Sequence, residues 1–500
     1  MGNGAEPSSL DPHAVNGVPE ATILLSLFEG LLVPDPKTAE PCPGAASSWY
    51  ISPDGLRYVF NLRENLRWSN GDPLVAKDFV YTFRRAISPK MGNPWVSFYY
   101  NVRNAEAYAT GKIGDFSDVG IRAIDDLTLE IILERPVVYF LELLAHVAWL
   151  PVHRDTIEKF GALDERDTRW IRPGNMVCNG PFMLKSWENG NYILVVKNPH
   201  YWDKDNVALE KIYFHAVSDS ATEERMYAAG DLDISSGLHV SKRPHYAKKG
   251  ELHIDPYMGC AWVAVNCQRP PFNDPRIRKA LALAINREEV NKIRGFGKDI
   301  NAYGAVPPDV HHYRSIKQGF QEDVQEARRL LAEAGYPGGK GFPKTEVLYN
   351  FSDQHHLVFE VLQSMWERNL GIHVDLVSQE WKVYLSMMGR GDFTLGRHCW
   401  VGDYNDPMTM LEIFEGGSAN NYTAWASTQY DYYLHQARNT ANEEKRIGFL
   451  QEAERIFVKE MPAIPLFWMN SIHLVSPRVK GWYPNVMDVH LWKGISKSKD

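Results

Sequence analysis

Segments with helix and strand periodicity alternate along the whole 500-residue chain, and Pro and Gly residues separate them. Strands are expected at residues 58–62, 127–133, 192–197, 261–266 and 372–376, and helices at 73–86, 274–284, 324–334 and 356–370. In the last helix, Val358, Val361, Leu362, Met365 and Trp366 share one face. Such a mixture predicts an α/β chain with helices layered on sheets. At roughly 100–200 residues per domain, the length predicts two to four domains.

Charge and hydropathy exclude two classes of protein. The formal net charge is −8, which argues against a nucleic-acid binder that relies on broad phosphate neutralisation. No apolar run approaches the ~18 residues that a membrane helix needs; the best segments, 139–150 and 280–285, are short or broken. The first residues show no signal-peptide pattern. If the protein is exported, we therefore expect that its signal has been removed.

Known catalytic and metal-binding motifs are missing from the sequence. It contains no GxSxG, HExxH, Walker A or GxGxxG string. The five cysteines show no CxxC spacing and are too few for a disulfide scaffold, although an oxidising compartment leaves one bridge open. These observations predict a protein that is not an enzyme and that carries no cofactor and no bound metal.

Several short strings occur in one order along the chain. They are SLDPH (9–13), LFEGL (27–31), WSNGDP (68–73), NGPF (179–182), NPHYW (198–202), GDLD (230–233), PFNDPRIR (271–278) and GDYNDP (402–407). Together they resemble the extracytoplasmic solute-binding proteins of peptide ABC importers, family 5, of the oligopeptide-binding type. The resemblance runs from about residue 8 to residue 490.

Some of these strings are also ordinary scaffold signals. Asp72-Pro73 and Asp274-Pro275 each read as an N-cap followed by Pro in the first helical turn, so helices are expected to begin there. Asn198-Pro199 is expected to end a strand, because Pro lacks the backbone donor that a sheet needs.

The resemblance implies a two-lobed periplasmic-binding-protein fold with hinge strands and an additional domain on the first lobe. Lobe I would comprise residues 1–41, 175–258 and 480–500, the extra domain 42–174, and lobe II 259–479. Ligand would bind in the cleft, and the lobes would close over it by a hinge motion.

A peptide receptor must satisfy the charged termini of its ligand, and a buried ammonium requires a carboxylate partner. The resemblance implies that Asp403 holds the peptide N-terminus and that Arg397 lies near the carboxyl end; a turn cap and a surface salt bridge are the alternatives. The further ligand-binding residues that it implies, each with a structural role as the alternative, are Trp400, Trp381, Glu29, His355, Asn420 and Trp262.

The sequence also departs from the family pattern. Met388 stands where a second cleft arginine is expected, and Ala264 replaces a cleft glutamate. Gly259 and Val401 occupy the positions of the family's inter-strand disulfide, while a Cys260–Cys399 bridge is left open. Ligand length and side-chain preference are therefore left undecided.

The function that the resemblance implies is capture of short peptides and their delivery to the membrane permease subunits of an ABC importer. We expect a monomer without nucleic-acid partners, located in the periplasm or anchored to the outer face of the cytoplasmic membrane. The alternatives are a muropeptide, an opine-like conjugate, or a chelated metal or haem held by His355, His398 or Cys399. A two-lobed hydrolase is a more distant alternative.

Overall fold

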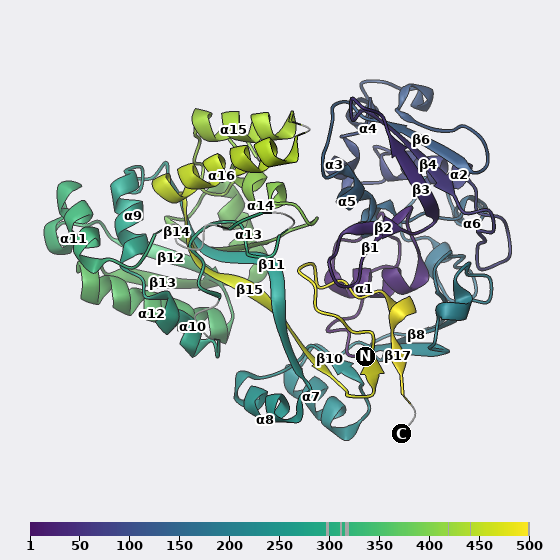
Figure 1. Ribbon diagram of the computed structural model, residues 1–500. Coiled ribbons are helices and arrows are strands. Elements are labelled where there is room, and N and C mark those ends of the chain that lie inside the picture. Colours follow the sequence, from purple (N-terminus) through teal and green to yellow (C-terminus); the bar gives the residue numbers. More distant parts are fainter. Residues whose placement is uncertain (297–299, 311–312, 316–319, 419, 441, 499–500) are drawn as a thin grey trace. The chain divides into compact units, whose positions relative to one another are not determined.

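The computed structural model describes residues 1–296, 300–310, 313–315, 320–418, 420–440 and 442–498 (Figure 1). The chain forms two compact units. Unit 1 comprises residues 1–255 and 471–500, and unit 2 comprises residues 256–470. The expected boundaries of the lobes and of the extra domain stay predictions. Among the described residues, no helix combines the length and the apolar character that crossing a bilayer requires.

Unit 1 contains a four-stranded antiparallel sheet with one buried face. The strand order is β3 (Ala46–Ile51), β4 (Arg57–Leu62), β6 (Thr128–Ile132) and β5 (Ile121–Ala123). In β4 the side chains of Tyr58, Phe60 and Leu62 are buried in alternation with more exposed neighbours, as period-2 geometry requires. Helix α2 (Ala76–Ala86) packs against β5 and β6. The expected strands at 58–62 and 127–133 are confirmed.

The expected start of the helix at Asp72-Pro73 is wrong. Helix α2 begins at Ala76, with Val75 as its N-cap. Pro73 instead forms an isolated antiparallel bridge with Arg67. The Asp78 carboxylate accepts a hydrogen bond from the Val75 backbone N–H at 2.9 Å, and this bond satisfies a donor at the helix start. A side chain inside the first turn thus sets the boundary, not the preceding Asp-Pro pair.

The SLDPH string is held by a buried ion pair. Arg85 of α2 donates to both carboxylate oxygens of Asp11, at 2.8 and 2.5 Å, and its guanidinium also lies 2.7 Å from Nδ1 of His13. All three residues are fully buried. Burial and the Arg85 charge lower the pKa of His13 to about 3, so the ring is neutral. The string therefore anchors the start of the chain inside unit 1.

Unit 1 also contains a second antiparallel sheet, which has three strands. Its order is β7 (Phe182–Glu188), β8 (Tyr192–Lys197) and β9 (Lys211–His215). Strand β8 ends just before Asn198-Pro199, as expected. Helix α1 (Val18–Leu27) packs against β7. Helices α7 (Ser220–Ala229) and α8 (Arg243–Lys249) contribute Tyr227 and Tyr246 to a small separate core.

The remaining elements of unit 1 are short. They are β1 (Leu32–Pro34), β2 (Pro41–Pro43), α3 (Val96–Tyr99), α4 (Ala105–Ala109), α5 (Phe140–Leu144), α6 (Arg154–Phe160), β10 (Ile234–Ser235), β16 (Val479–Lys480) and β17 (Ser496–Lys497).

Two long strands carry the chain from one unit to the other. Strand β11 (Leu252–Val265) leaves unit 1 between Asp255 and Pro256, and strand β15 (Ala463–Val475) returns between Asn470 and Ser471. The strand expected at 261–266 is therefore the far end of a longer strand. Its buried half lies in unit 2, where Met258 to Val265 are all buried, and this half carries the apolar run that the sequence shows.

Unit 2 is built on a mixed sheet. The strand order is β15, β11, β14 (Leu395–Val401), β12 (Thr345–Asn350) and β13 (Val374–Gln379), and β10 extends the sheet beside the unit 1 end of β15. Strands β12, β13 and β14 are parallel to one another, and β11 is antiparallel to β14. Helix α12 (Asp353–Leu370) follows β12, and helix α13 (Trp381–Arg390) follows β13. The carboxyl ends of three parallel strands thus share one edge of the sheet.

Helix α12 buries the face that its apolar spacing predicts. Leu362, Met365 and Trp366 are almost fully buried, and Trp366 Nε1 donates to the Leu281 carbonyl of α9 (Pro275–Leu283) at 3.1 Å. Asp274 caps α9 by accepting from the Arg276 backbone N–H, which confirms that prediction. The other helices of unit 2 are α10 (Arg287–Ile293), α11 (Val324–Glu333), α14 (Met408–Leu411), α15 (Thr428–Arg438) and α16 (Glu443–Glu460).

Candidate functional site

Three of the sequence-predicted binding residues follow the three parallel strands of unit 2. His355 lies in the first turn of α12 after β12, Trp381 is the first residue of α13 after β13, and Asp403 comes two residues after the end of β14. Because the strands are parallel, these residues lie at the same edge of the sheet. The carboxyl edge of parallel strands is where α/β proteins usually bind their ligands.

Contacts with other residues of unit 2 fix the loop that carries Asp403. Asp406, three residues later, forms a buried bidentate ion pair with Arg446 of α16, at 2.6 and 2.8 Å. The Asp403 backbone N–H donates to Thr409 Oγ1 at 3.2 Å. Gly402 approaches Met258 so closely that a Cβ would lie 2.8 Å from its sulfur. The GDYNDP string therefore encodes a fixed turn that presents the Asp403 side chain.

The Asp403 carboxylate has no cationic partner among the described residues. The side chain is partly buried, and neither a hydrogen bond nor an ion pair reaches its oxygens within that part of the chain. Burial, together with the negative charge of Glu412, raises the pKa of Asp403 to about 7. The site is thus a half-desolvated carboxylate that lacks a positive charge.

The arginine that contacts Glu412 binds another carboxylate more closely. Arg438 of α15 lies 3.4 Å from Glu412 but binds Glu415 more closely, at 2.6 and 2.7 Å. Glu412 also accepts a hydrogen bond from Tyr404 Oη at 2.9 Å. Glu412 and Glu415 therefore share the Arg438 guanidinium, while Asp403 beside Glu412 has no cation of its own in the described chain, and this imbalance favours a cationic ligand.

Arg397 forms a second, positive region of unit 2, and the neutral ring of His355 lies near it. Arg397 is a partly buried residue of β14 whose Nη2 lies 3.1 Å from Cys399 Sγ, and no carboxylate in the described chain pairs with it. His355 Nδ1 lies 3.3 Å from the Asn350 carbonyl. Burial first, and the positive charge of Arg397 second, lower the pKa of His355 to about 4. The electrostatic coupling shows that the fold brings these two residues near each other.

The three predicted tryptophans differ in burial. Trp262 is fully buried, donates from Nε1 to His398 Nδ1 at 2.9 Å and packs against Phe414, so it belongs to the core of unit 2. Trp400 is partly buried, and its Nε1 has no hydrogen-bond partner. Trp381 is 49% exposed and stacks on the ring of Tyr384. Their contacts with ligand, like that of the exposed Asn420, stay predictions.

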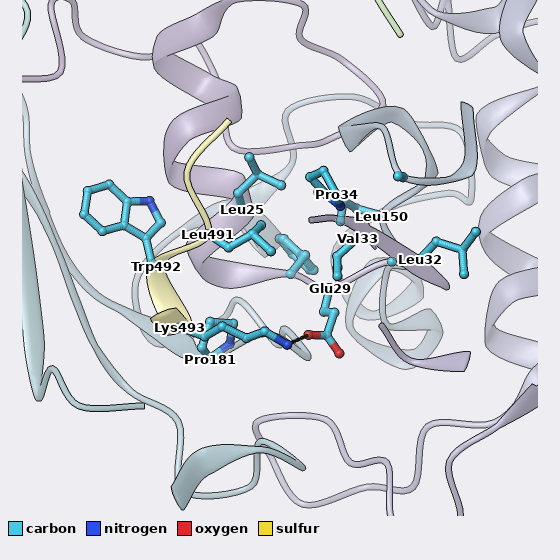
Figure 2. A pocket seen from close by; sticks show the side chains of 13 residues that line it. Leu25, Glu29, Leu32, Val33, Pro34, Leu150, Pro181, Leu491, Trp492 and Lys493 are labelled. Atoms are coloured by element: carbon cyan, nitrogen blue, oxygen red, sulfur yellow. Dashed lines mark ion pairs between the residues drawn. The ribbon is translucent and has the colours of Figure 1, made fainter. Parts of the chain in front are cut away.

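Glu29 belongs to unit 1, whereas the other predicted binding residues belong to unit 2. It is buried, and its carboxylate accepts hydrogen bonds from Tyr201 Oη and from Trp202 Nε1, the latter at 2.6 Å. Lys493 Nζ lies 3.6 Å from it, as Figure 2 shows. The pocket beside it has a cavity volume of about 20 Å³, enough for one or two water molecules. These contacts argue for a structural role of Glu29, and ligand binding there stays a prediction.

All five cysteines are free thiols in the structure. Gly259 and Val401 are direct register partners across β11 and β14, whereas Cys260 pairs with Trp400. Cys399 faces Ala261, so Cys260 and Cys399 are out of step by one residue and project from opposite faces of the sheet. A bridge between them, left open by the sequence, does not form in this register.

Sequence reasoning missed the groups that set the electrostatics of the site. Glu412 and Arg438 come from the segment after α14 and from α15, and neither lies in a recognisable string. Tyr384 was missed as well, although its hydroxyl donates to the Arg397 carbonyl and fixes the strand there. The only available signal was the acidic residue Glu412 close after GDYNDP, which alone indicates no role.

Comparisons with known proteins agree with this arrangement. The chain is 35% identical over 492 residues to the periplasmic oligopeptide-binding protein OppA of Escherichia coli, with 96% of this chain and 88% of that protein covered. The solved structure of the E. coli murein tripeptide binding protein MppA matches with a TM-score of 0.83, 32% identity and coverage of 99% and 97%. Haemophilus influenzae OppA in complex with the peptide RPPGFSPFR matches with a TM-score of 0.82, 32% identity and coverage of 100% and 98%.

The likeness extends over both units, and the architecture is therefore the two-lobed α/β fold of these binding proteins, with β11 and β15 as the connecting strands. The family model for the middle region of the bacterial extracellular solute-binding proteins, family 5, matches residues 40–422. We conclude that the chain belongs to the bacterial extracellular solute-binding proteins of family 5.

Proposed function

We propose that this protein captures oligopeptides outside the cytoplasmic membrane and delivers them to an ABC importer, without doing chemistry on them. Membership of the family and 35% identity to an oligopeptide-binding protein support the substrate class. The missing nucleophile and metal motifs support a binding role. The single observation that carries the proposal is the state of Asp403.

The ammonium group at a peptide's N-terminus is the partner that Asp403 lacks. A buried cation is stabilised only if a carboxylate and hydrogen bonds replace its water. Asp403 is partly buried, ionises only near pH 7 and has Glu412 beside it. An ammonium in contact with Asp403 would lower the pKa of the carboxyl and neutralise a charge that the empty protein leaves unpaired.

Arg397 and His355 provide a second anchor for a ligand of the opposite polarity. Val401 lies four residue steps after Arg397 on β14, or roughly 13 Å of strand, before the turn to Asp403. An extended peptide also advances by about 3.3 Å per residue, so about four residues span the same length. A peptide of a few residues bound with its N-terminus at Asp403 would therefore place its carboxylate in the region of Arg397.

The remaining parts of the proposal follow from the family. The ligand-bound form would be one in which the two units close by bending β11 and β15, a hinge motion. The membrane permease subunits would recognise that form. We propose a monomer in the periplasm or anchored at the outer face of the cytoplasmic membrane.

The test compares peptides with free and with acetylated N-termini. Calorimetric titration of the Asp403→Ala variant with a free tri- or tetrapeptide is expected to show a 10²–10³-fold loss of affinity, as for loss of one partner of a buried charge pair. The acetylated peptide should lose less than about threefold. Asp392→Ala, which removes an exposed aspartate of unit 2, is the matched control and should bind as the parent does. Equal losses for both peptides would remove Asp403 from the amine-binding role.

A murein peptide is a second candidate, favoured by the likeness to MppA. A chelated metal held by His355, His398 and Cys399 has less support, because these residues do not form a three-ligand group among the described residues. Native mass spectrometry of the purified protein separates the candidates by the mass of the retained ligand. A ligand without a primary amine would contradict the proposal for either peptide class.

A further inference from the structure

We propose that His473, Asp488 and His490 form a binding site for one divalent transition-metal cation, for which zinc fits best. The site belongs to unit 1, whereas the proposed peptide-binding residues belong to unit 2, and its function is structural. It joins the C-terminal segment to strand β15.

The three side chains converge on a small volume. His473 Nε2 lies 2.9 and 3.1 Å from the two oxygens of Asp488, and His490 Nε2 lies 3.1 Å from Oδ1 of the same carboxylate. One ligand atom from each residue lies within 4.8 Å of the others. In a tetrahedral zinc site with bonds of about 2.0–2.1 Å, neighbouring ligand atoms are roughly 3.3 Å apart. The two imidazole–carboxylate separations are therefore close to those of a zinc site, and the two imidazole nitrogens lie within 4.8 Å of each other.

The backbone around Asp488 is fixed in advance. Asp488 adopts a φ of 53°, in the left-handed region that few non-glycine residues occupy. The buried side chain of Asn485 holds this turn, accepting from the N–H groups of Met487 and Val489 at 3.2 Å and donating to the Val489 carbonyl at 2.8 Å. The strained turn aims the carboxylate at the two imidazoles. Positions that store backbone strain in this way are often functional.

The chemistry of the three groups suits zinc better than calcium or magnesium. Two imidazole nitrogens and one carboxylate make a typical set of three ligands with an open fourth position, whereas calcium and magnesium prefer oxygen ligands throughout. Metal binding would move the Nε2 proton of His473 to Nδ1. That nitrogen is buried and has no hydrogen-bond partner, so the change of tautomer breaks no bond on that side of the ring.

The surroundings orient the ligands and favour a cation. Trp482 stacks on His490 with ring centroids 3.5 Å apart and meets the edge of His473 at 5.0 Å, so both rings are held in place. Burial raises the pKa of the Asp255 carboxyl, and the groups whose charges act on it include His473, Asp488 and His490. A second acidic group therefore faces the same cluster and would be stabilised by a bound cation.

The position of the cluster explains what the ion would do. His473 lies on β15 two residues after the chain has re-entered unit 1, and Asp255 is the last residue of unit 1 on β11. Asp488 and His490 belong to the loop that follows β16. A metal ion would cross-link this loop to the unit 1 end of the connecting strand and reduce local opening of both.

The test measures zinc binding by the full chain, stripped with a chelator and freed of tags that bind metal. Native mass spectrometry and calorimetric titration with Zn²⁺ are expected to show one ion per chain. Asp488→Asn keeps the shape of the side chain and suits the left-handed backbone, so it should fold normally and bind zinc at least 100-fold more weakly. His490→Asn should show the same loss. His245→Asn removes an exposed histidine of unit 1 and should bind zinc as the parent does.

A second measurement locates the ion. Zn²⁺ should slow hydrogen exchange of the amides in residues 482–490 of the parent, and not in the Asp488→Asn variant. Co²⁺ in place of zinc should give the absorption of a four-coordinate centre that the variant lacks. Equal zinc affinity of the parent and the Asp488→Asn variant, or no stoichiometric binding by the parent, would overturn the proposal.

Discussion

Glu29 in unit 1 and Asp403 in unit 2 are both carboxylates in strings typical of the family, yet their surroundings differ. Glu29 is buried with donors from Tyr201 and Trp202 and with Lys493 nearby. Asp403 is only partly buried, has no cation partner in the described chain and lies beside another acid, Glu412. A carboxylate whose partners are all internal stabilises the fold, whereas one that lacks a partner is available to a ligand.

The largest effect expected from this comparison is on stability. Glu29→Ala would leave the Tyr201 hydroxyl and the Trp202 indole N–H without their acceptor in a buried site, and Lys493 would keep only Asp203 as its carboxylate partner among the described residues. Removing one partner of a buried charged pair typically lowers the free energy of unfolding by about 3–5 kcal/mol. Chemical denaturation should show a lower midpoint for Glu29→Ala and no loss for Asp403→Ala. Equal losses in the two variants would contradict the distinction between them.

Asp403→Asn is expected to stabilise the ligand-free protein at pH 8. The folded-state pKa of Asp403, about 7, lies above the ordinary aspartate value of 3.8. Its contribution to stability is therefore fully present below pH 3.8 and is lost as the pH rises to 7. At about 1.4 kcal/mol per pKa unit the loss is at most ~4 kcal/mol, and we expect a gain of about 2 kcal/mol from the amide at pH 8. Unfolding measured at pH 3.5 should show almost no difference between parent and variant.

The pH dependence of peptide affinity should reveal the ionisation of the Asp403 carboxyl. Because Asp403 must be ionised to pair with an ammonium, affinity is expected to fall by up to tenfold per unit as the pH drops below 7. It should also fall above about pH 8, where a peptide's α-amino group loses its proton. Titrations from pH 5 to 9 with free and acetylated peptides test this expectation. A flat profile for the free peptide would be incompatible with an amine–Asp403 contact.

The smallest effect is expected from Tyr201→Phe. This change removes one hydrogen bond to Glu29 and leaves the ring in place, at a cost of about 1 kcal/mol. Peptide affinity should stay within twofold of the parent. A large change in affinity with unchanged stability would show that the Glu29 cluster takes part in ligand binding after all.

Much of the fold could be predicted from local signals, because these act within a few residues. The strand at 192–197 and the cap of α9 by Asp274 are examples. The start of α2 was missed, since the deciding hydrogen bond comes from Asp78 inside the helix. The strand at 261–266 was predicted too short because the rest of β11 is only half-buried and lacks a continuous apolar run.

For the candidate site, the sequence alone selected Asp403, because the GDYNDP string carries the resemblance to the family, and its role in binding stays a prediction. It also determined membership of the family. Only the tertiary structure decided that Glu412 lies beside Asp403, that Arg438 is drawn to Glu415, and that His473 meets Asp488 and His490. The reason is physical: burial, charge pairing and metal-ligand geometry depend on distances between segments that are remote in the chain, and no local pattern records those distances.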